Sequence, residues 1–556
     1  MSKLFELNLH ALSNVNPQLY SRLVNHRQKR EVYTFQESRS GELVPAYLMP
    51  SAPPLPLHSM VDPRREAQRL VSTASGGTGF LIFLGLGGGF APQAALEHTC
   101  AQVLVIDFCL DSIAGLFSAR DYTGLLRNER FTLFVDPSDD EIKNFILEQY
   151  RPALCDGIKT IPLRTRTERA LSEFDAAAAV IEKAVENISG DYSVQAHFGI
   201  RWFSNIIRNL KTAETAPELL TEKNPIQEAA IAAAGPSLDT QIPSLIEHKS
   251  RQVFILCSDT ALPVLMHHGI EPDAVVSIDC QHISYYHFMG CNLRRDIPLV
   301  LDIASPPLLS HFSPSPFFFS GGHPLALYIS RYWRPLPLLD TSGGNVTYAC
   351  LSLAESLGAR RITLFGADFS YIRSSTYARG TYIYPFFEKK QNRLSPLEAL
   401  FSAFLYRSPF LPAQTGQNYY ETSPLRFYRK KLEEKAAVSP ALITAADGQG
   451  APIELPYRAA KTTASPALFS AGKAAASAIE FLEQYRSDIA ALPAAREKTG
   501  YMQELTVKSR QVFTTLLPLA AALKHRSPML NTCELIEETK YRCIQEIDLV
   551  LEREYR

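Results

Sequence analysis

The residues of this chain best suited to chemistry form a Gly-Pro-Ser turn between a short apolar run and a predicted helix. They are Gly235, Pro236, Ser237 and Leu238. Glycine lets the backbone approach a ligand closely, and a helix N-terminus adds free N–H groups and a partial positive charge. With the hydroxyl of Ser237, the turn predicts a cradle for a nucleotide phosphate. An ordinary tight turn is the alternative, because Gly-Pro is a common turn pair.

Three more polar clusters end apolar runs of strand length further along the chain. They contain Ser258 and Asp259, then Asp279, Gln281 and His282, and then Gly366, Ala367 and Asp368. A second glycine-rich turn, which opens another predicted helix, contains Ser342, Gly343, Gly344 and Asn345. Strands that alternate with helices form parallel sheets, and ligands bind beyond the carboxyl ends of such strands. We therefore expect the clusters and both turns to gather at one site.

Four side chains are candidates for the general base of a transfer reaction. They are Asp279, His282, His323 and Asp368. Histidine suits proton transfer because its ordinary pKa is close to neutral pH. A single histidine is more often structural, and an aspartate after a strand also serves as a helix cap or turn residue. The sequence leaves the choice among the four open.

Residues 224–451 resemble the motility-associated factor (Maf) glycosyltransferases, which modify flagellin. The resemblance rests on the order and spacing of AAAGPSLD at 232–239, SDTALPVLMHHGIEPDAVVSIDCQ at 258–281, SGGNVTYACLSLAESLGARRITLFGADFSY at 342–371, TYARGTY at 376–382, TSPLRFYRKKLE at 422–433 and AADGQGAPI at 445–453. The Gly-Pro-Ser-Leu turn also looks like the one with which bacterial sialyltransferases hold a CMP-sugar. Two positions depart from these patterns. Ala233 and Ala234 replace a common Gly-Asn, and Ala367 replaces a common glutamine.

The resemblance implies a CMP-activated nonulosonic acid as donor, of the pseudaminic or legionaminic acid type. The acceptors would be Ser or Thr hydroxyls of flagellin, and the reaction would serve flagellar assembly and motility. The first turn would hold the phosphate or ribose of the donor, and the second turn its cytidine or phosphate. By the same resemblance, the donor site would also be lined by Ser258, Asp259, Gln281 and Gly366.

Departing CMP carries a single phosphate, so we expect hydroxyl groups and a few cations to stabilise it without a metal or another cofactor. The side chains available for this task follow Asp368 closely in the chain. They are Tyr371, Arg373, Tyr377 and Arg379.

Two other functions stay open. The same segment resembles an archaeal enzyme that transfers pyrophosphate from ATP to hydroxymethylpterin, in which case Asp259 and Asp279 would hold Mg²⁺. The non-enzymatic alternative is a flagellin-binding or assembly factor with a vestigial pocket. Nucleotide preference and dependence on Mg²⁺ discriminate among the three.

The composition excludes several classes of protein. The 556 residues are 46% hydrophobic and 20% charged, with a formal net charge of −1, so nucleic acid is not a favoured partner. Nine cysteines are scattered without a CxxC pair, which argues for reduced thiols and against structural zinc. The N-terminus lacks a signal-peptide pattern, and the most apolar run, residues 80–90, is too short to span a bilayer. We therefore expect a cytoplasmic protein.

The pattern along the chain predicts a multidomain α/β protein. Residues 1–212 form a Rossmann-like domain with a helical bridge, 213–460 a central catalytic domain with a parallel, sialyltransferase-like (GT-A-like) sheet, and 461–556 a helical bundle. The helices of the last part predict either core packing or a docking surface for the acceptor protein.

Two further segments have two interpretations each. A glycine loop at 85–89 follows a predicted strand, and Asp107 ends the next strand, as in a nucleotide-binding Rossmann unit. Close packing of helix on sheet explains the same glycines, and we favour it. The aromatic and basic segment 384–455 predicts a lid over the donor sugar, which we favour, or a surface excursion pinned by its aromatic rings.

Overall fold

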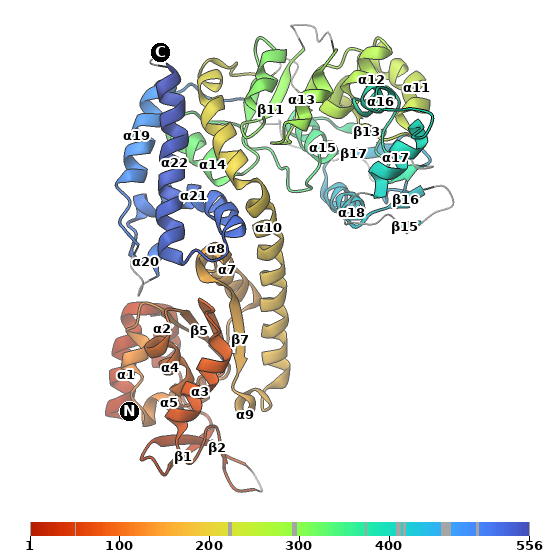
Figure 1. The fold of residues 1–556 in the computed structure, drawn as a ribbon. Helices are drawn as coiled ribbons and strands as arrows, with labels where there is room; N and C mark the ends of the chain where they lie inside the picture. Colours follow the sequence, from red (N-terminus) through yellow and green to blue (C-terminus); the bar gives the residue numbers. More distant parts are fainter. Residues whose placement is uncertain are drawn as a thin grey trace. The chain divides into compact units, whose positions relative to one another are not determined.

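The computed structural model describes most of the chain (Figure 1). The described residues are 2–49, 52–220, 225–291, 297–372, 375–406, 413–414, 419–456, 469–495 and 500–554. Their contacts form two compact units. Unit 1 contains Met1–Gly199, Leu492–Arg510 and Leu517–Tyr541, and unit 2 contains Ile200–Ala491, Gln511–Leu516 and Arg542–Arg556. The two units share the C-terminal helices, and the bounds of the three predicted domains stay a prediction.

Unit 2 is built on a seven-stranded sheet in which every pair of neighbouring strands is parallel, with the order β12-β11-β10-β9-β8-β13-β17. The strands are β8 (Glu228–Ala232), β9 (Phe254–Ser258), β10 (Ala274–Ser277), β11 (Leu299–Asp302), β12 (Phe317–Phe319), β13 (Arg361–Phe365) and β17 (Leu442–Ala445). β9, β10, β11 and β12 lie on one side of β8, in chain order, and β13 and β17 lie on its other side. The order of the strands therefore reverses between β8 and β13, which is the place where parallel sheets bind ligands.

Helices cover this sheet because its strands are apolar on both faces. They are α11 (Leu238–Ser250), α12 (Leu262–His267), α13 (Ile283–Phe288), α14 (Pro324–Tyr332), α15 (Val346–Ser356) and α18 (Ser423–Val438), with two 3₁₀ turns, η1 (Asp259–Ala261) and η2 (Pro307–Phe312). α15 packs on β8, β9 and β10. Its Leu351 belongs to one buried core with Ile231, Leu256 and Leu364 of the sheet. This arrangement confirms the predicted α/β class.

The segment 384–455 has secondary structure of its own. It contains most of α16 (Ile383–Glu388), then α17 (Leu397–Tyr406), β15 (Ala413–Gln414), β16 (Tyr419–Glu421), α18 and the edge strand β17. β15 and β16 form a small antiparallel sheet with β14 (Tyr371–Ile372), which precedes the segment. The aromatic rings of α16 and α17 pack together, with Phe387 and Phe401 buried and their ring centroids 5.0 Å apart. These aromatic rings therefore pack with one another inside the segment, and the choice between the lid and the surface excursion stays open.

Unit 1 contains a parallel sheet with the order β6-β5-β4-β7, from β4 (Phe80–Leu84), β5 (Gln102–Asp107), β6 (Phe131–Val135) and β7 (Ile158–Pro162). An antiparallel sheet precedes it, from β1 (Tyr33–Glu37), β2 (Leu43–Tyr47) and β3 (Leu55–Pro56). The helices are α1 (Lys3–Val15), α2 (Pro17–Val24), α3 (Pro63–Ser75), α4 (Phe90–His98), α5 (Leu110–Ala119), α6 (Thr123–Leu126), α7 (Asp139–Gln149), α8 (Pro152–Cys155) and α9 (Arg164–Thr167). The four parallel strands confirm the predicted Rossmann-like topology.

The remaining elements are helices. α10 runs without a break through Leu171–Thr215, which confirms the helix expected there, and the division between the units falls within it at Gly199. The C-terminal helices are α19 (Ala478–Ala490), α20 (Tyr501–Glu504), α21 (Val507–Arg526) and α22 (Thr532–Glu554). Among the described residues, no helix combines the length and the apolar character that crossing a membrane requires. All nine cysteines are free thiols.

The glycine loop after β4 is filled by side chains of unit 1 itself. A Cβ atom at Gly87 would lie 2.6 Å from Nε2 of His58, and one at Gly85 would lie 2.9 Å from the side chain of Arg166. The N–H of Gly88 donates to Nε2 of His58 over 2.8 Å, and burial lowers the pKa of His58 to about 4. These contacts are those that the close-packing interpretation predicts.

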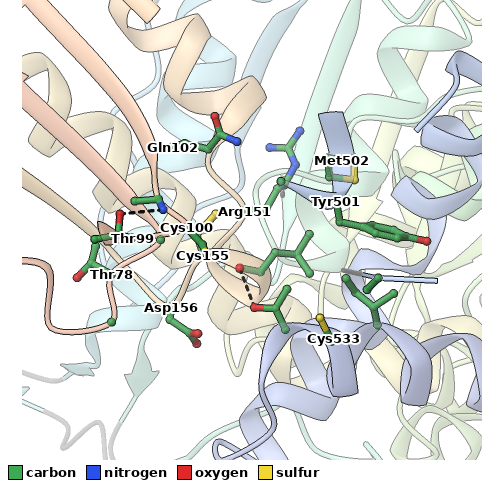
Figure 2. Close-up of a pocket in the computed structure, with 18 of the residues that line it drawn as sticks. Thr78, Thr99, Cys100, Gln102, Arg151, Cys155, Asp156, Tyr501, Met502 and Cys533 are labelled. Carbon is green, nitrogen blue, oxygen red and sulfur yellow. Dashed lines mark hydrogen bonds between the residues drawn. The ribbon is translucent and has the colours of Figure 1, made fainter. Parts of the chain in front are cut away.

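A cavity of about 440 Å³ lies at the amino-terminal edge of the same sheet (Figure 2). Its walls come from the residues before β4 and β5, from α8 and from the C-terminal helices of unit 1. The hydroxyl of Thr532 donates to the carbonyl of Leu154 over 3.2 Å, which ties α22 to α8. Cys155 lies in this wall, and burial raises the pKa of its thiol.

Candidate functional site

The first predicted turn lies where the strand order reverses. The N–H of Gly235, after β8, donates to the carbonyl of Gly366, after β13, over 2.8 Å. The N–H of Ser237 donates to Oδ2 of Asp368 over 2.8 Å. A Cβ atom at Gly235 would lie 2.4 Å from that carboxylate, so only glycine allows the two loops to meet this closely. The structure thus brings together two of the predicted clusters.

A third segment, residues 446–451 after β17, covers the turn. The N–H of Gln449 donates to the hydroxyl of Ser237 over 3.0 Å, and a Cβ atom at Gly450 would lie 2.6 Å from Oδ1 of Asp368. Gln241 of α11 donates from Nε2 to the carbonyl of Asp447 over 2.8 Å. Ser237 is consequently only 5% exposed. In this structure the 446–451 segment therefore covers the hydroxyl of Ser237.

Asp368 is buried at the centre of these contacts. Burial raises the pKa of its carboxyl group, and the hydrogen bonds from Ser237 oppose that rise. A carboxylate with a raised pKa is a better proton acceptor than an exposed one. Its hydrogen bonds to Ser237 also fix the turn, so its geometry fits a positioning role as well as a catalytic one.

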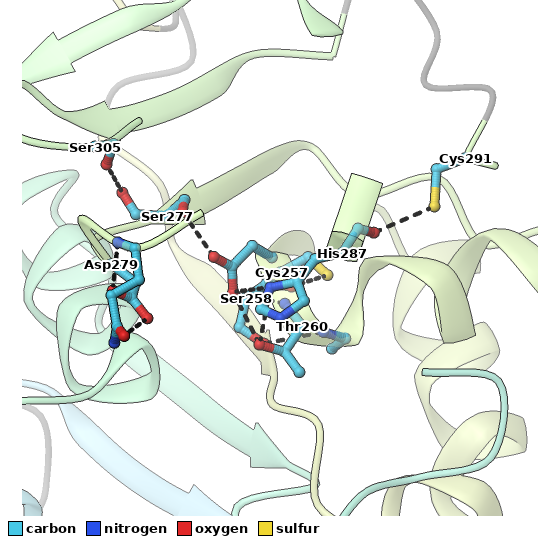
Figure 3. A network of polar contacts seen from close by, with 11 residues as sticks. Cys257, Ser258, Thr260, Ser277, Asp279, His287, Cys291 and Ser305 are labelled. Atoms are coloured by element: carbon cyan, nitrogen blue, oxygen red, sulfur yellow. Dashed lines mark hydrogen bonds and ion pairs between the residues drawn. The ribbon is translucent and has the colours of Figure 1, made fainter. Parts of the chain in front are cut away.

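A second polar network, of which Figure 3 labels Thr260, Ser277 and His287, surrounds Asp259, directly after β9. The hydroxyl of Ser277 donates to Oδ2 over 2.6 Å, and the N–H of Thr260 donates to Oδ1 over 2.6 Å. Nδ1 of His287, on α13, lies 3.3 Å from the same Oδ1. Burial opposes ionisation of Asp259, but the charge of His287 and these hydrogen bonds outweigh it and hold the pKa below its ordinary value. Asp259 is therefore a buried carboxylate whose two oxygens are already engaged.

Sequence reasoning missed His287. The residue is 7% exposed, its ring lies 4.8 Å from that of Tyr382 between centroids, and its Nδ1 lies 3.4 Å from the hydroxyl of Thr260. A carboxylate that engages Nδ1 fixes the ring so that Nε2 is the nitrogen free to exchange a proton with a substrate. The available signal was the polar end of β9 together with a histidine on the helix that follows the next strand.

Asp279 follows β10 on the same edge of the sheet. The N–H of Gln281 donates to its Oδ1 over 2.8 Å. Burial raises the pKa of Asp279, and the charge of Asp259 adds to that rise. The two carboxylates thus influence each other, as expected for residues that follow neighbouring parallel strands.

Tyrosine side chains from the 371–428 region approach this pair of aspartates. Burial raises the pKa of Tyr377, and the charges of Asp259 and Asp279 raise it further. Burial also raises the pKa of Tyr428, and the charge of Asp279 adds to the effect. Burial raises the pKa of Tyr371, and the charge of Tyr428 adds to that rise. The predicted Tyr377 therefore lies near both aspartates, and Tyr428, which sequence analysis did not name as a site residue, lies near Asp279. Tyr371 lies near Tyr428.

Comparison with known proteins agrees with this fold. The solved structure described as "Structure of MAf glycosyltransferase from Magnetospirillum magneticum AMB-1" matches with a TM-score of 0.56 over 99% of this chain and 95% of that chain, at 15% identity. This chain has the fold of that Maf glycosyltransferase. The fold expected from the resemblance in residues 224–451 is therefore confirmed, and it extends over nearly the whole chain.

Two sequence comparisons add to the structural one. A family model described as "6-hydroxymethylpterin diphosphokinase MptE-like" matches residues 203–374. Two proteins of Treponema pallidum (strain Nichols), each described as "Uncharacterized protein", are 38% identical over 149 residues and 39% identical over 125 residues. These matches cover 26% and 21% of this chain, and 53% and 59% of the two relatives. The chain thus spans little more than half the length of each relative.

The second predicted turn of this Maf-like fold is held by its own side chains. The hydroxyl and the N–H of Ser342 both donate to Oδ1 of Asp340, and the hydroxyl of Tyr348 donates to Oδ2 over 2.7 Å. Burial opposes ionisation of Asp340, but these hydrogen bonds lower its pKa to about 2. Asn345 caps α15 by accepting the N–H of Tyr348 over 3.0 Å. Its side-chain oxygen is therefore engaged, while Gly343 is buried and Gly344 is exposed.

The remaining predicted residues have different surroundings. His282 is exposed at the start of α13. His323 caps α14 by accepting the N–H of Leu325 over 3.2 Å, and burial lowers its pKa to about 3, which fits the structural alternative. The N–H of Arg379 donates to Asp239 over 2.9 Å, so the backbone of this residue borders the first turn. Arg373 lies outside the described residues.

Sequence analysis did not predict two further features at the carboxyl edge of the unit 2 sheet. Asp302, at the end of β11, is buried, and burial raises its pKa to about 6. Asn205 of α10 donates to the carbonyls of Cys280 and Ala304, at 3.0 and 2.8 Å. Such contacts fix the loops after β10 and β11, and only the folded chain reveals them. In the described part of the chain, no group of three or more His, Cys, Asp or Glu side chains is arranged to hold a metal ion.

Proposed function

We propose that this protein is a glycosyltransferase that moves a nonulosonic acid, of the pseudaminic or legionaminic acid type, from a CMP-sugar to Ser or Thr hydroxyls of flagellin. The observation that supports the proposal best is the buried His287–Asp259 pair at the carboxyl edge of the unit 2 sheet. The Maf glycosyltransferase fold and the sequence motifs support it independently. The donor, the acceptor and the role in motility rest on the resemblance, and the proposed cytoplasmic location rests on the sequence pattern.

The reaction needs a base for the acceptor hydroxyl. In the proposed step, the acceptor oxygen attacks the anomeric carbon while its proton passes to Nε2 of His287. Asp259 then stabilises the imidazolium that forms, and its contact with Nδ1 keeps the ring in place. The bond between the anomeric carbon and the phosphate oxygen breaks, and CMP leaves with the electron pair.

The departing CMP needs hydrogen-bond donors. We propose that the turn at Gly235–Ser237 receives its phosphate once the 446–451 segment has moved away, with Gly366, Ser258 and the turn at 342–345 around the nucleotide. Tyr428, which is influenced by the charge of Asp279, and its neighbour Tyr371 would contact the sugar or phosphate through their hydroxyls. Asp279 and Gln281, after β10, would contact the sugar or the acceptor.

A pyrophosphate transfer like that of the pterin enzyme is the second candidate, and the match of residues 203–374 favours it. That reaction needs a divalent cation, which carboxylates of the protein and phosphates of the substrate would bind. Asp259 would have to release Ser277, Thr260 and His287 to bind such a cation, because these groups engage both of its oxygens. This cost makes Asp259 a poor ligand for Mg²⁺ and favours the glycosyltransferase.

The test is a reaction of the purified chain with flagellin and CMP-legionaminic acid or CMP-pseudaminic acid, followed by intact-mass analysis of flagellin. We expect added mass equal to one or more nonulosonic acid residues, both with and without a chelator. No added mass, combined with ATP-dependent pyrophosphate transfer that a chelator abolishes, would reverse the choice. Binding of CMP without any transfer would favour the non-catalytic flagellin-binding factor.

A further inference from the structure

A second cavity, of about 240 Å³, lies within unit 1 at the opposite edge of its sheet from the one in Figure 2. It opens beyond the carboxyl ends of β5 and β6, between Phe108 and Asp136, and the antiparallel sheet contributes Tyr47 to its wall. Ligands of Rossmann-like sheets bind beyond these strand ends. The glycine loop after β4 is filled by side chains, whereas this neighbouring space is open.

Three arginines line the cavity: Arg30, Arg166 and Arg169. Arg166 is only 2% exposed. Its Nε and Nη2 lie 3.1 and 2.8 Å from Oδ1 of Asp107, and Nη2 also donates to the carbonyl of Phe108 over 2.6 Å. Its Nη1 makes no hydrogen bond with the described residues. A buried guanidinium fixed on one side, with an unused N–H group on the other, is a preformed donor for an anion.

The other two arginines are exposed and make no ion pair with a carboxylate among the described residues. Nη2 of Arg30 lies 3.7 Å from Sγ of Cys109, which holds the side chain beside the end of β5. Arg169 follows α9, three residues after Arg166. Both guanidinium groups thus have donors to spare at the rim of the cavity.

The acids in the wall do not cancel these charges. Asp136 is paired with Arg22 over 3.2 Å, and its Oδ1 accepts the N–H of Cys109 over 2.7 Å. Glu173 accepts the hydroxyl of Ser172 and is exposed. The lining itself contains three arginines and two acids, and Asp111, which also acts on Arg30, is hydrogen-bonded to His26.

The backbone at the cavity is strained as well. Cys109 has φ +76°, in the left-handed region that residues with a side chain rarely adopt. The contact of its N–H with Asp136 holds this conformation and places Cys109 and Ser112 in the wall. Strain of this kind is concentrated at functional sites.

We infer that this cavity binds a compact phosphate, either inorganic phosphate or the phosphate group of a small ester. A guanidinium group donates two parallel hydrogen bonds to two oxygens of one phosphate. The volume of the cavity fits a compact phosphate better than a dinucleotide. The aromatic side chains of Tyr47 and Phe108 would contact the organic part of an ester. The inference does not depend on the proposed transfer reaction, because all the residues belong to unit 1.

The test is calorimetric titration of the full chain with inorganic phosphate and with ribose 5-phosphate. We compare the wild type, the double variant Arg30→Ala/Arg169→Ala and the control Arg164→Ala, an exposed arginine of α9 outside the cavity wall. We expect the double variant to lose about tenfold or more in affinity, because each removed guanidinium takes away charged hydrogen bonds. The control should bind like the wild type.

The two probes identify the source of the phosphate. Tighter binding of ribose 5-phosphate than of phosphate would assign a phosphate ester to the site, and equal or weaker binding would assign free phosphate. Equal affinity of all three proteins, or no binding to the wild type at millimolar phosphate, would overturn the inference. Circular dichroism of the double variant verifies that both replaced side chains, which are exposed, leave the fold intact.

Discussion

At the scale of single residues, the pairing of His287 with Asp259 gives the proposed site its chemistry. Asp259 is 1% exposed and keeps its negative charge because Ser277, Thr260 and His287 stabilise it. A fixed carboxylate beside one ring nitrogen orients the imidazole and stabilises its protonated form. The exposed His282 and the capping His323 lack such a partner among the described residues, so neither has the support that a general base needs.

Replacing His287 with glutamine should therefore lower kcat for sugar transfer about 100- to 10,000-fold, which is the usual contribution of a general base. The same change should remove the acidic limb of the pH–rate profile, which a purely structural role would leave in place. The measurement is initial-rate kinetics by mass spectrometry of flagellin. His267→Gln, an exposed histidine at the end of α12, is the matched control and should keep the wild-type rate. Loss of rate in His282→Gln with a normal rate in His287→Gln would contradict the assignment.

Asp302 makes a prediction about pH and stability. Burial raises its pKa from 3.8 to about 6, against hydrogen bonds from Ala304 and Gly321 that lower it. The folded chain therefore holds this proton more tightly than the unfolded chain does. The stability gained by protonation is present below about pH 4 and is lost as the pH rises through about 6, with a total of about 3 kcal/mol.

Urea unfolding of the wild type and of Asp302→Asn from about pH 4 to pH 7 tests this linkage. The variant cannot ionise at this position, so its free energy of unfolding should rise relative to the wild type as the pH increases through this window. Other titrating groups are shared by the two proteins and cancel in the difference. Parallel stability profiles would show that Asp302 titrates normally.

At the scale of elements, the sequence predicted most strands of both sheets. Apolar runs such as those at 80–84 and 254–258 end at glycine or polar residues, and this local pattern also determines the burial of the strand. The turn at Gly235 was recognisable because glycine alone fits beside Asp368, where a Cβ atom would lie 2.4 Å from the carboxylate. At these places the local sequence and the packing of the folded chain favour the same structure.

Other elements were not predictable, because their positions depend on contacts between distant segments. β17 follows α18, more than 70 residues after β13, and its pairing with β13 is visible only in the fold. The cover of Ser237 by Gln449 joins residues 212 positions apart. The pairing of Asp259 with His287 likewise depends on how α13 packs against the end of β9, which no periodicity in the sequence specifies.

At the scale of the whole molecule, the two units hold two separate candidate sites. Unit 1 has cores on both faces of its sheet, around Leu81 and around Ile82, and unit 2 has a core of its own around Ile231. A ligand stabilises the conformation that binds it, so the backbone near its contacts opens less often. Backbone amides exchange their hydrogens with water only when the chain opens locally, so they exchange more slowly at the binding site. The proposals for the two units therefore lead to different patterns of protection.

Hydrogen exchange measured by mass spectrometry separates the two patterns. We expect CMP to slow exchange in residues 233–239 and 366–372 of unit 2, because the proposed cradle and its neighbouring loop contact the nucleotide. We expect inorganic phosphate to slow exchange in residues 108–112 and 166–173 of unit 1, where the arginine-lined cavity lies. In Arg30→Ala/Arg169→Ala, protection by phosphate should vanish while protection by CMP persists. Protection by CMP confined to unit 1 would mean that the turn at Gly235 is not the nucleotide site, because its amides would then open as readily with the ligand as without it.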